Sequence, residues 1–113
     1  GVRAPSAAPS GSAPSAAPAR VPAPESRALA EQNQLFAEAT AARRSGDAAA
    51  AVAAYDRLLA RYPDSFLAES AAVERMRSLE SMDHARGREA AAAYLGRYPN
   101  GFARAEAARL LGR

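Results

Sequence analysis

Two short stretches of the chain carry almost the same residues 36 positions apart, and this repeat constrains the fold more than any other feature. The first reads LARYPDSF at residues 59–66 and the second reads LGRYPNGF at residues 95–102. The Tyr-Pro pair in each should end a helix, because the residue before a proline is pushed out of the α conformation. A two-residue turn follows, and then a Phe, Phe66 or Phe102, that should start the next helix on its inward face. A repeat of this length indicates stacked hairpins, each made of two helices.

The apolar residues around these prolines recur at helical spacing, and no window alternates as a strand does, so we expect an all-α domain of five helices. One face of the first helix should carry Leu29, Gln32, Phe36, Ala39 and Arg43, with Leu35 beside them. The expected inward side chains of the next three helices are Val52, Tyr55, Leu58, Leu59 and Tyr62, then Phe66, Val73, Met76 and Leu79, then Ala90, Ala91, Tyr94, Leu95 and Tyr98. A short fifth helix should run from Phe102 to Leu111.

Turn and cap residues separate these expected helices. Gly46 can supply a left-handed end to the first helix, and Asp47 is a suitable N-cap for the second. Asp64 and Ser65 are the expected caps of the third helix, which should break near residues 81–83.

Residues 1–24 differ in composition from the rest of the chain: they hold six of the eight prolines, with mostly Ala, Ser and Gly between them. Such a segment cannot bury enough apolar area to offset the entropy lost on ordering. We therefore predict a disordered, semi-extended N-terminal linker that tethers a helical domain at residues 25–113. A proline-rich ligand for an aromatic-lined groove is the alternative interpretation of this segment.

Charge and composition argue against several classes of function. From Glu25 onward, thirteen arginines face twelve acidic residues, an excess too small to neutralise a row of nucleic-acid phosphates. The absence of cysteine excludes disulfides, thiolate catalysis and Cys-ligated zinc. No apolar run approaches eighteen residues, so we expect no membrane span in this sequence.

The stretch LFAEATAARRSGDAAAAVAAYDRLLARYPDS resembles a tetratricopeptide repeat. It has a large apolar residue opening the first helix, a small residue four positions later, a Gly-Asp turn, and then an Ala, an aromatic and a terminal Pro on the second helix. The matching residues are Leu35, Ala39, Gly46, Asp47, Ala51, Tyr55 and Pro63. The resemblance implies a helical hairpin and a role in binding other proteins.

A second, degenerate unit follows the first. It keeps Tyr94, Leu95 and Pro99, but Ser81-Met82-Asp83-His84 replaces the Gly-Asp turn, and its first helix is expected to be about half a turn longer. The predicted array of about two and a half hairpins therefore consists of a first repeat at 29–63, a second at 64–99 and a capping helix at 100–113.

The ending of each unit is also similar to repeats of bacterial envelope proteins. Examples are the outer-membrane assembly lipoproteins of the BamD type and the periplasmic repeat protein of the Tol–Pal system. This resemblance implies a periplasmic or cell-envelope location, with the cytoplasm as the alternative. Because the chain begins with Gly rather than Met, we expect it to be a fragment or a processed product.

The sequence predicts no active site, no cofactor and no metal centre. His84 is the only histidine, and with Glu80 it could offer two metal ligands on one helix face, but a third ligand is missing. Carboxylates at helical spacing from arginines are expected to form exposed pairs of small energetic value, namely Glu74 with Arg77 and Glu106 with Arg109.

In the family that this chain resembles, the first helix of each repeat lines a groove for a partner peptide. Carried onto this sequence, the groove residues are Asn33, Phe36, Thr40, Arg43 and Arg44. The pattern with which some members grip a C-terminal carboxylate is not reproduced, since Phe36 and Thr40 occupy its places. A solvated helix end is the alternative interpretation of the two arginines.

The sequence therefore predicts a non-catalytic protein–protein interaction module with a protein or peptide partner. It would be the soluble C-terminal part of a larger envelope-associated bacterial protein, such as a membrane-anchored regulator. The alternative is an assembly or scaffold subunit of an outer-membrane or periplasmic machine. Because arrays usually need about three repeats, a partner or a second copy in a homo-oligomer could cover the open end of this one.

Overall fold

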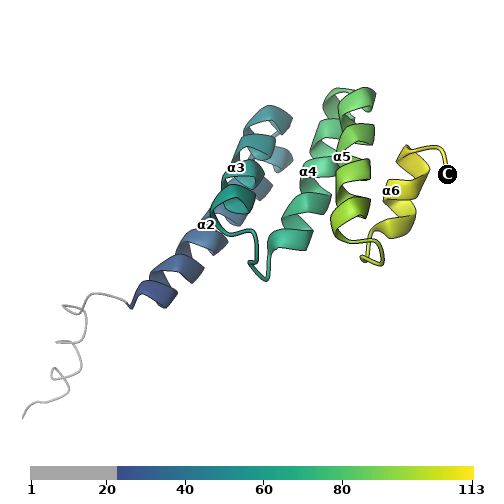
Figure 1. Ribbon diagram of the computed structural model, residues 1–113. Coiled ribbons are helices and arrows are strands. Elements are labelled where there is room, and N and C mark those ends of the chain that lie inside the picture. The colour runs from purple at the N-terminus through teal and green to yellow at the C-terminus, as the bar shows by residue number, and fades with distance from the viewer. Residues whose placement is uncertain (1–22) are drawn as a thin grey trace, which may run out of the picture.

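A computed structural model describes residues 23–113, and this part of the chain contains helices and turns but no strand (Figure 1). The all-α prediction is thereby confirmed. The five helices are α2 (Pro24–Arg44), α3 (Ala48–Arg61), α4 (Ala68–Met82), α5 (His84–Arg97) and α6 (Arg104–Leu110). Pro24, which we had assigned to the linker, is the first helical residue, a position where its missing N–H is not needed. The disorder expected for the remainder of the linker falls on residues 1–22, outside the described residues.

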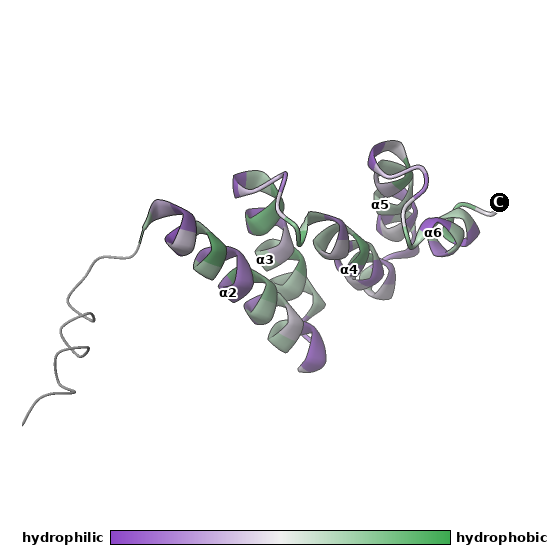
Figure 2. Ribbon diagram, turned by 90° about the horizontal axis from the view of Figure 1, so that it is seen from below, coloured by the Kyte–Doolittle hydropathy of each residue, from purple (hydrophilic) through white to green (hydrophobic). Residues whose placement is uncertain are grey.

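Each helix packs against the next one along the chain: α2 on α3, α3 on α4, α4 on α5 and α5 on α6. Figure 1 shows the α2–α3 and α4–α5 hairpins side by side, with the short α6 at the far end. Along each helix, hydrophobic residues are interrupted by hydrophilic ones, as expected for helices that bury one side (Figure 2). The fold is the expected array of two and a half hairpins.

The second helices of the two hairpins, α3 and α5, are equivalent structures 36 residues apart. Each is 14 residues long, and their N-caps, Asp47 and Asp83, accept hydrogen bonds from backbone N–H groups of the first turn. Their C-caps are Tyr62 and Tyr98, each followed by proline. The sequence repeat is thus a structural repeat of the second helix and of the junction after it. Asp83, which the sequence analysis placed in a degenerate turn, keeps the cap in register.

The turns inside the two hairpins differ. In the first, Gly46 adopts a φ of +86°, a left-handed conformation that glycine tolerates best. In the second, α4 continues to Met82, the position equivalent to Gly46, so its C-terminal end extends two residues further than that of α2. The expectation of a helix half a turn longer therefore holds only at this C-terminal end, because α4 as a whole has 15 residues against 21 in α2. Asp83 alone separates α4 from α5, and it serves as the C-cap of one and the N-cap of the other.

The α4–α5 hairpin is closed tightly at Gly87. A Cβ atom at this position would lie 2.7 Å from the Cα atom of Glu80, a distance that real Cβ atoms do not tolerate. The equivalent residue of the first hairpin is Ala51, which is fully buried. The second unit therefore also keeps a small residue at this helix contact, which the sequence analysis did not identify.

Two clusters of buried side chains form the core. The first cluster contains Leu35, Ala39, Ala51, Ala54, Tyr55, Leu58 and Ala71. The second contains Val73, Met76, Leu79, Ala90, Ala91, Tyr94, Ala103 and Ala107. Because alanine makes up so much of both clusters, a few large side chains supply most of the apolar burial, at about 2–3 kcal/mol each. Tyr55, Leu58 and Met76 are the largest of those that are fully buried.

Three side chains that were expected to point inward are exposed. Leu29 is 47% exposed. Helix α3 ends at Arg61, which pairs with Glu31, and so it does not extend over Leu29. Phe66 and Phe102 are 69% and 67% exposed, and both lie in turns before a helix rather than inside one. The prediction that each Phe starts the next helix on its inward face is therefore wrong.

The physical reason is the way in which α4 begins. The hydroxyl of Ser65 accepts a hydrogen bond from the N–H of Leu67 at 3.0 Å, which holds residues 65–67 in a turn. The helix starts only after Leu67, whose side chain makes no capping bond, so Asp64 and Ser65 are not its caps. In the same way, α6 starts at Arg104 rather than at Phe102.

A polar network ties the second junction to the core. The hydroxyl of Tyr94 donates a hydrogen bond to Glu69 at 2.7 Å and accepts one from the backbone N–H of Ala103 at 3.0 Å. The Glu69 carboxylate also accepts from the N–H of Phe102 at 3.1 Å. By contrast, the buried hydroxyl of Tyr55 has no hydrogen-bond partner among the described residues. The hydroxyl of Tyr94 therefore belongs to a hydrogen-bond network, whereas that of Tyr55 does not.

Alanine substitutions at two glycines of α5 test the hairpin contact. Gly87→Ala should destabilise the domain by about 1–3 kcal/mol, because the new Cβ atom would overlap the backbone of Glu80. Gly96→Ala is the matched control: nothing lies within 4 Å of its added Cβ atom, so it should stabilise by about 0.5–1 kcal/mol. Equal thermal midpoints, followed by circular dichroism, would contradict the tight packing at Gly87.

Phenylalanine substitutions test the two tyrosine hydroxyls. Tyr94→Phe should cost about 1–3 kcal/mol, because it leaves the buried N–H of Ala103 without its acceptor. Tyr55→Phe should be neutral or stabilising, because it removes a buried hydroxyl that has no partner in residues 23–113. Chemical denaturation of both variants measures the difference. A larger loss for Tyr55→Phe than for Tyr94→Phe would show that the network is assigned to the wrong ring.

Candidate functional site

The predicted groove residues lie along one side of α2, and the structure gives them different surroundings. Asn33 and Arg44 are exposed, whereas Thr40 is half-buried. Phe36 is also half-buried and packs edge-on against Tyr55, with ring centroids 5.7 Å apart. Arg43 is exposed but forms an ion pair with α4. The aromatic residue of the set is therefore partly a core residue, and the polar residues remain accessible.

A chain of ion pairs links α2, α4 and α6, and we call the side that carries it the α2–α4–α6 face. Arg43 Nε lies 3.4 Å from a carboxylate oxygen of Glu74. The other oxygen of Glu74 accepts from Arg77 at 3.0 Å. Arg77 then makes two hydrogen bonds to Glu106 on α6, at 2.9 and 2.7 Å. The expected local pair of Glu74 with Arg77 is present, but it is one link of a longer chain.

The bond between Arg77 and Glu106 is the strongest link of this chain, because a guanidinium that donates twice to one carboxylate matches it in charge and in shape. The hydrogen bonds from Arg77 hold the pKa of Glu106 below its usual value, and the carboxylate in turn raises the pKa of Arg77. These charges satisfy each other, so they hold the three helices together and leave little net charge for a ligand.

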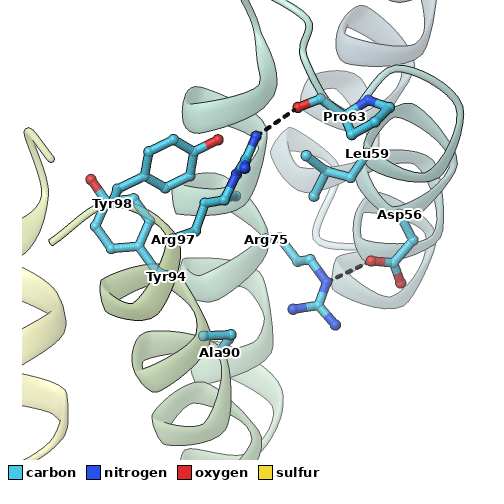
Figure 3. A pocket seen from close by; sticks show the side chains of 10 residues that line it. Asp56, Leu59, Pro63, Arg75, Ala90, Tyr94, Arg97 and Tyr98 are labelled. Carbon is cyan, nitrogen blue, oxygen red and sulfur yellow. Dashed lines mark hydrogen bonds and ion pairs between the residues drawn. The ribbon is translucent and has the colours of Figure 1, made fainter.

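A pocket of about 310 Å³ lies on a different side of the array, between α3, α4 and α5 (Figure 3). Its apolar lining consists of Leu59, Ala72, Ala90, Ala93 and Tyr94. Asp56 and Arg75 stand at one end of the pocket, and Pro63, Arg97 and Tyr98 stand at the other. Each helix of the pair α3 and α5 supplies one long wall, and the pocket therefore depends on the 36-residue register that makes these helices equivalent.

Two guanidinium groups reach over this pocket from opposite ends. Arg75 donates from Nε to Asp56 at 2.5 Å. Arg97 lies over the ring of Tyr98, with 5.5 Å between the guanidinium carbon and the ring centroid, and its Nη2 reaches the carbonyl of Pro63 at 3.3 Å. A hydrogen bond with the Tyr98 hydroxyl raises the pKa of Arg97, which stays charged. The pocket combines an apolar floor with two cationic ends.

Metal-binding side chains do not form a cluster in the part of the chain that the structure describes. Across residues 23–113, no three His, Cys, Asp or Glu side chains lie close enough together to hold a metal ion. His84 Nδ1 is 3.0 Å from Glu80, and this exposed pair lies at the turn between α4 and α5. None of the helices in this part of the chain is long and apolar enough to cross a membrane.

Comparison with known proteins identified one similarity. Residues 35–65 match the tetratricopeptide repeat family, and they comprise the C-terminal part of α2, all of α3 and the junction that follows. No curated protein and no solved structure matched the chain. The match covers about a quarter of the chain, and together with the stacked hairpins it indicates a tetratricopeptide-like fold. Repeats of that family typically bind other proteins. The similarity to envelope proteins stays a prediction.

Sequence reasoning did not find the pocket or the bond between Arg77 and Glu106. The pocket residues come from three helices, and no sequence pattern fixes how far apart α3 and α5 lie. For Glu106, the local alternative Arg109 was the nearer arginine in sequence, and only the position of α6 beside α4 brings Arg77 closer. Helices α4 and α6 begin 36 residues apart, at residues 68 and 104, and this repeat was the signal that could have indicated that α6 lies beside α4.

Acid titration tests the link between α4 and α6. Because the pKa of Glu106 is lower in the folded than in the unfolded chain, its pairing stabilises the fold above the unfolded pKa, and this contribution is lost as pH falls through the folded pKa. Glu106→Gln should therefore lower the free energy of unfolding near neutral pH by about 1 kcal/mol or less, and make the thermal midpoint fall less steeply in acid. Glu38→Gln, which removes an exposed pair with Arg57, is the control. An acid dependence unchanged from that of the parent chain would contradict the assignment.

Proposed function

We propose that the chain is a non-catalytic protein-interaction module that binds a peptide or protein segment on the α2–α4–α6 face. The observation that carries this proposal is the tetratricopeptide match at residues 35–65, together with the two stacked hairpins that extend it. Stacked helical repeats present extended surfaces made of equivalent helices, and these surfaces are suited to binding partners rather than to performing chemistry.

Three polar side chains on α2 are the proposed contacts. Asn33 and Arg44 are exposed, Thr40 is half-buried between them, and all three lie on the side predicted for the groove. Hydrogen bonding to an extended backbone suits the amide and the hydroxyl, and the guanidinium suits a carboxylate or a carbonyl. Arg43 already pairs with Glu74, so it should position α2 against α4 more than it contacts the partner.

We also propose that the module acts in the bacterial periplasm or cell envelope, as the soluble part of a membrane-anchored regulator. The support is the resemblance of its Y-P-[D/N]-[S/G] junctions to those of envelope repeat proteins. A scaffold subunit of an outer-membrane or periplasmic machine is the alternative. The two differ in what the chain captures: a regulator binds one signalling partner, whereas a scaffold subunit co-purifies with a stable assembly.

Crosslinking capture from the native cells tests the interaction. The parent chain is compared with the triple variant Asn33→Ala, Thr40→Ala, Arg44→Ala, and with the control Gln34→Ala, Arg88→Ala, whose exposed residues lie on another side of α2 and on α5. We expect the triple variant to lose at least tenfold of the captured partner while the control keeps it. Equal capture by all three chains would contradict the proposed face. Recovery of only cytosolic enzymes or nucleic acid would contradict the envelope location.

A further inference from the structure

The pocket between α3, α4 and α5 lies apart from the face proposed above, and its chemistry differs. On the α2–α4–α6 face, the charges of Glu74, Arg77 and Glu106 satisfy one another. In the pocket, two arginines stand over an apolar floor with donor groups to spare. Its lining residues come from α3, α4 and α5, and none comes from α2.

Arg75 has hydrogen-bond donors that are not used within the described residues, unlike the paired arginine Arg77. Its Nε binds Asp56, but neither Nη group has a hydrogen-bond partner within the described residues. In Figure 3 both Nη groups point away from Asp56. The side chain is only 32% exposed, so it is held in place by its surroundings. A fixed guanidinium with two open Nη groups matches the two oxygens of a carboxylate.

Arg97 is the more adjustable of the two arginines. Its contacts with the Pro63 carbonyl and the Asp64 carboxylate are long, at 3.3 and 3.5 Å, and its side chain is 58% exposed. Hydrogen bonds of this length are weak and can be exchanged for a better acceptor. The ring of Tyr98 beneath the guanidinium keeps the group near the pocket when that exchange occurs.

The spacing of the two ends limits the shape of the ligand. Asp56, which holds Arg75, and Pro63, which meets Arg97, are seven residues apart along α3 and its C-terminal end. At 1.5 Å per residue this separation is about 10 Å. Seven residues of a second helix cover the same length, and between its ends such a helix places one residue directly over the pocket. The volume of about 310 Å³ suits one bulky apolar side chain.

We propose that this pocket docks an amphipathic helix of a partner protein, whose central apolar side chain fills the pocket and whose two acidic side chains, about seven residues apart, bind Arg75 and Arg97. Helices α3 and α5 form the two walls of the groove in which the partner helix lies, in the helix-in-groove mode of recognition. The charge of the pocket lining supports an acidic ligand, because it contains Arg75 and Arg97 but a single acidic residue, Asp56, and the contact of Arg97 with Asp64 outside the lining is long, at 3.5 Å.

A defined peptide tests the proposal with the whole chain. The probe is an alanine-based 18-residue helix with a central Leu, one Glu four positions before it and one Glu three positions after it, and both ends blocked. Fluorescence anisotropy should show binding that weakens about tenfold when either Glu becomes Gln, and at least tenfold when the Leu becomes Ala. Binding of equal strength by the parent peptide and its Gln version overturns the proposal.

Two neighbouring alanines of α5 provide matched protein variants. Ala93 lines the pocket and Ala92 does not, and both are exposed, so neither substitution should disturb the core. Ala93→Leu fills the pocket and should abolish peptide binding, whereas Ala92→Leu should leave it unchanged. Arg97→Glu should weaken binding of the acidic peptide and restore it for a peptide with Lys in place of the second Glu. Insensitivity to Ala93→Leu overturns the proposal.

The same variants separate this proposal from the proposed function. Peptide binding that is lost with Asn33→Ala, Thr40→Ala, Arg44→Ala but kept with Ala93→Leu would overturn the pocket site and support the α2–α4–α6 face. If Ala93→Leu changes the mass of the chain in light scattering but not peptide binding, the occupant is a second copy, which also overturns the proposal. Thermal midpoints of all variants, expected to stay within a few degrees of the parent, confirm that they are folded.

Discussion

The equal length of α3 and α5 is the constraint on which the remainder of the structure depends. Each helix is held between an aspartate N-cap and a Tyr-Pro end, so both begin and end 36 residues apart. The helices that follow, α4 and α6, consequently begin at equivalent positions, residues 68 and 104. This alignment lets Arg77 of α4 reach Glu106 of α6. It also makes α3 and α5 the two walls of one pocket. Helix length, set by local signals, therefore determines which distant side chains meet.

The two surfaces that this alignment creates differ in their electrostatics: the charges of one are paired with each other, whereas the other carries a small positive excess. On the α2–α4–α6 face the carboxylates and guanidiniums pair with one another, so their main effect is to fix the angle between helices, and a partner must rely on uncharged groups and on Arg44. In the pocket the arginines keep open donor groups beside an apolar floor, so an acidic and apolar ligand gains contacts without first breaking a strong ion pair. The two proposed sites therefore require partner segments of different chemistry.

The sequence predicted the elements whose signals are local. Tyr62-Pro63, Gly46 and Asp47 each act on the adjacent backbone, and the helix ends that they predict are present. The prediction failed at one local turn and wherever the outcome depended on a distant element. Phe66 was expected inward because of its spacing, but a turn held by Ser65 delays the helix and leaves the ring exposed. The groove residues on α2 were placed by resemblance to a family, and the structure shows their accessibility but not their partner. The pocket depends on the separation of α3 and α5, which no local pattern encodes.

Because each helix packs against the next one along the chain, we expect the repeated junctions to join the hairpins into one cooperative array rather than two independent units. Amide hydrogen exchange of the whole chain under native conditions measures this directly, because it gives an opening free energy for each helix. The slowest amides of α3, α4 and α5 should share one opening free energy, and this value should fall together in all three when the chain is destabilised by Gly87→Ala. Separate opening free energies for α3 and for the α4–α5 hairpin, with only the latter falling in the variant, would contradict it.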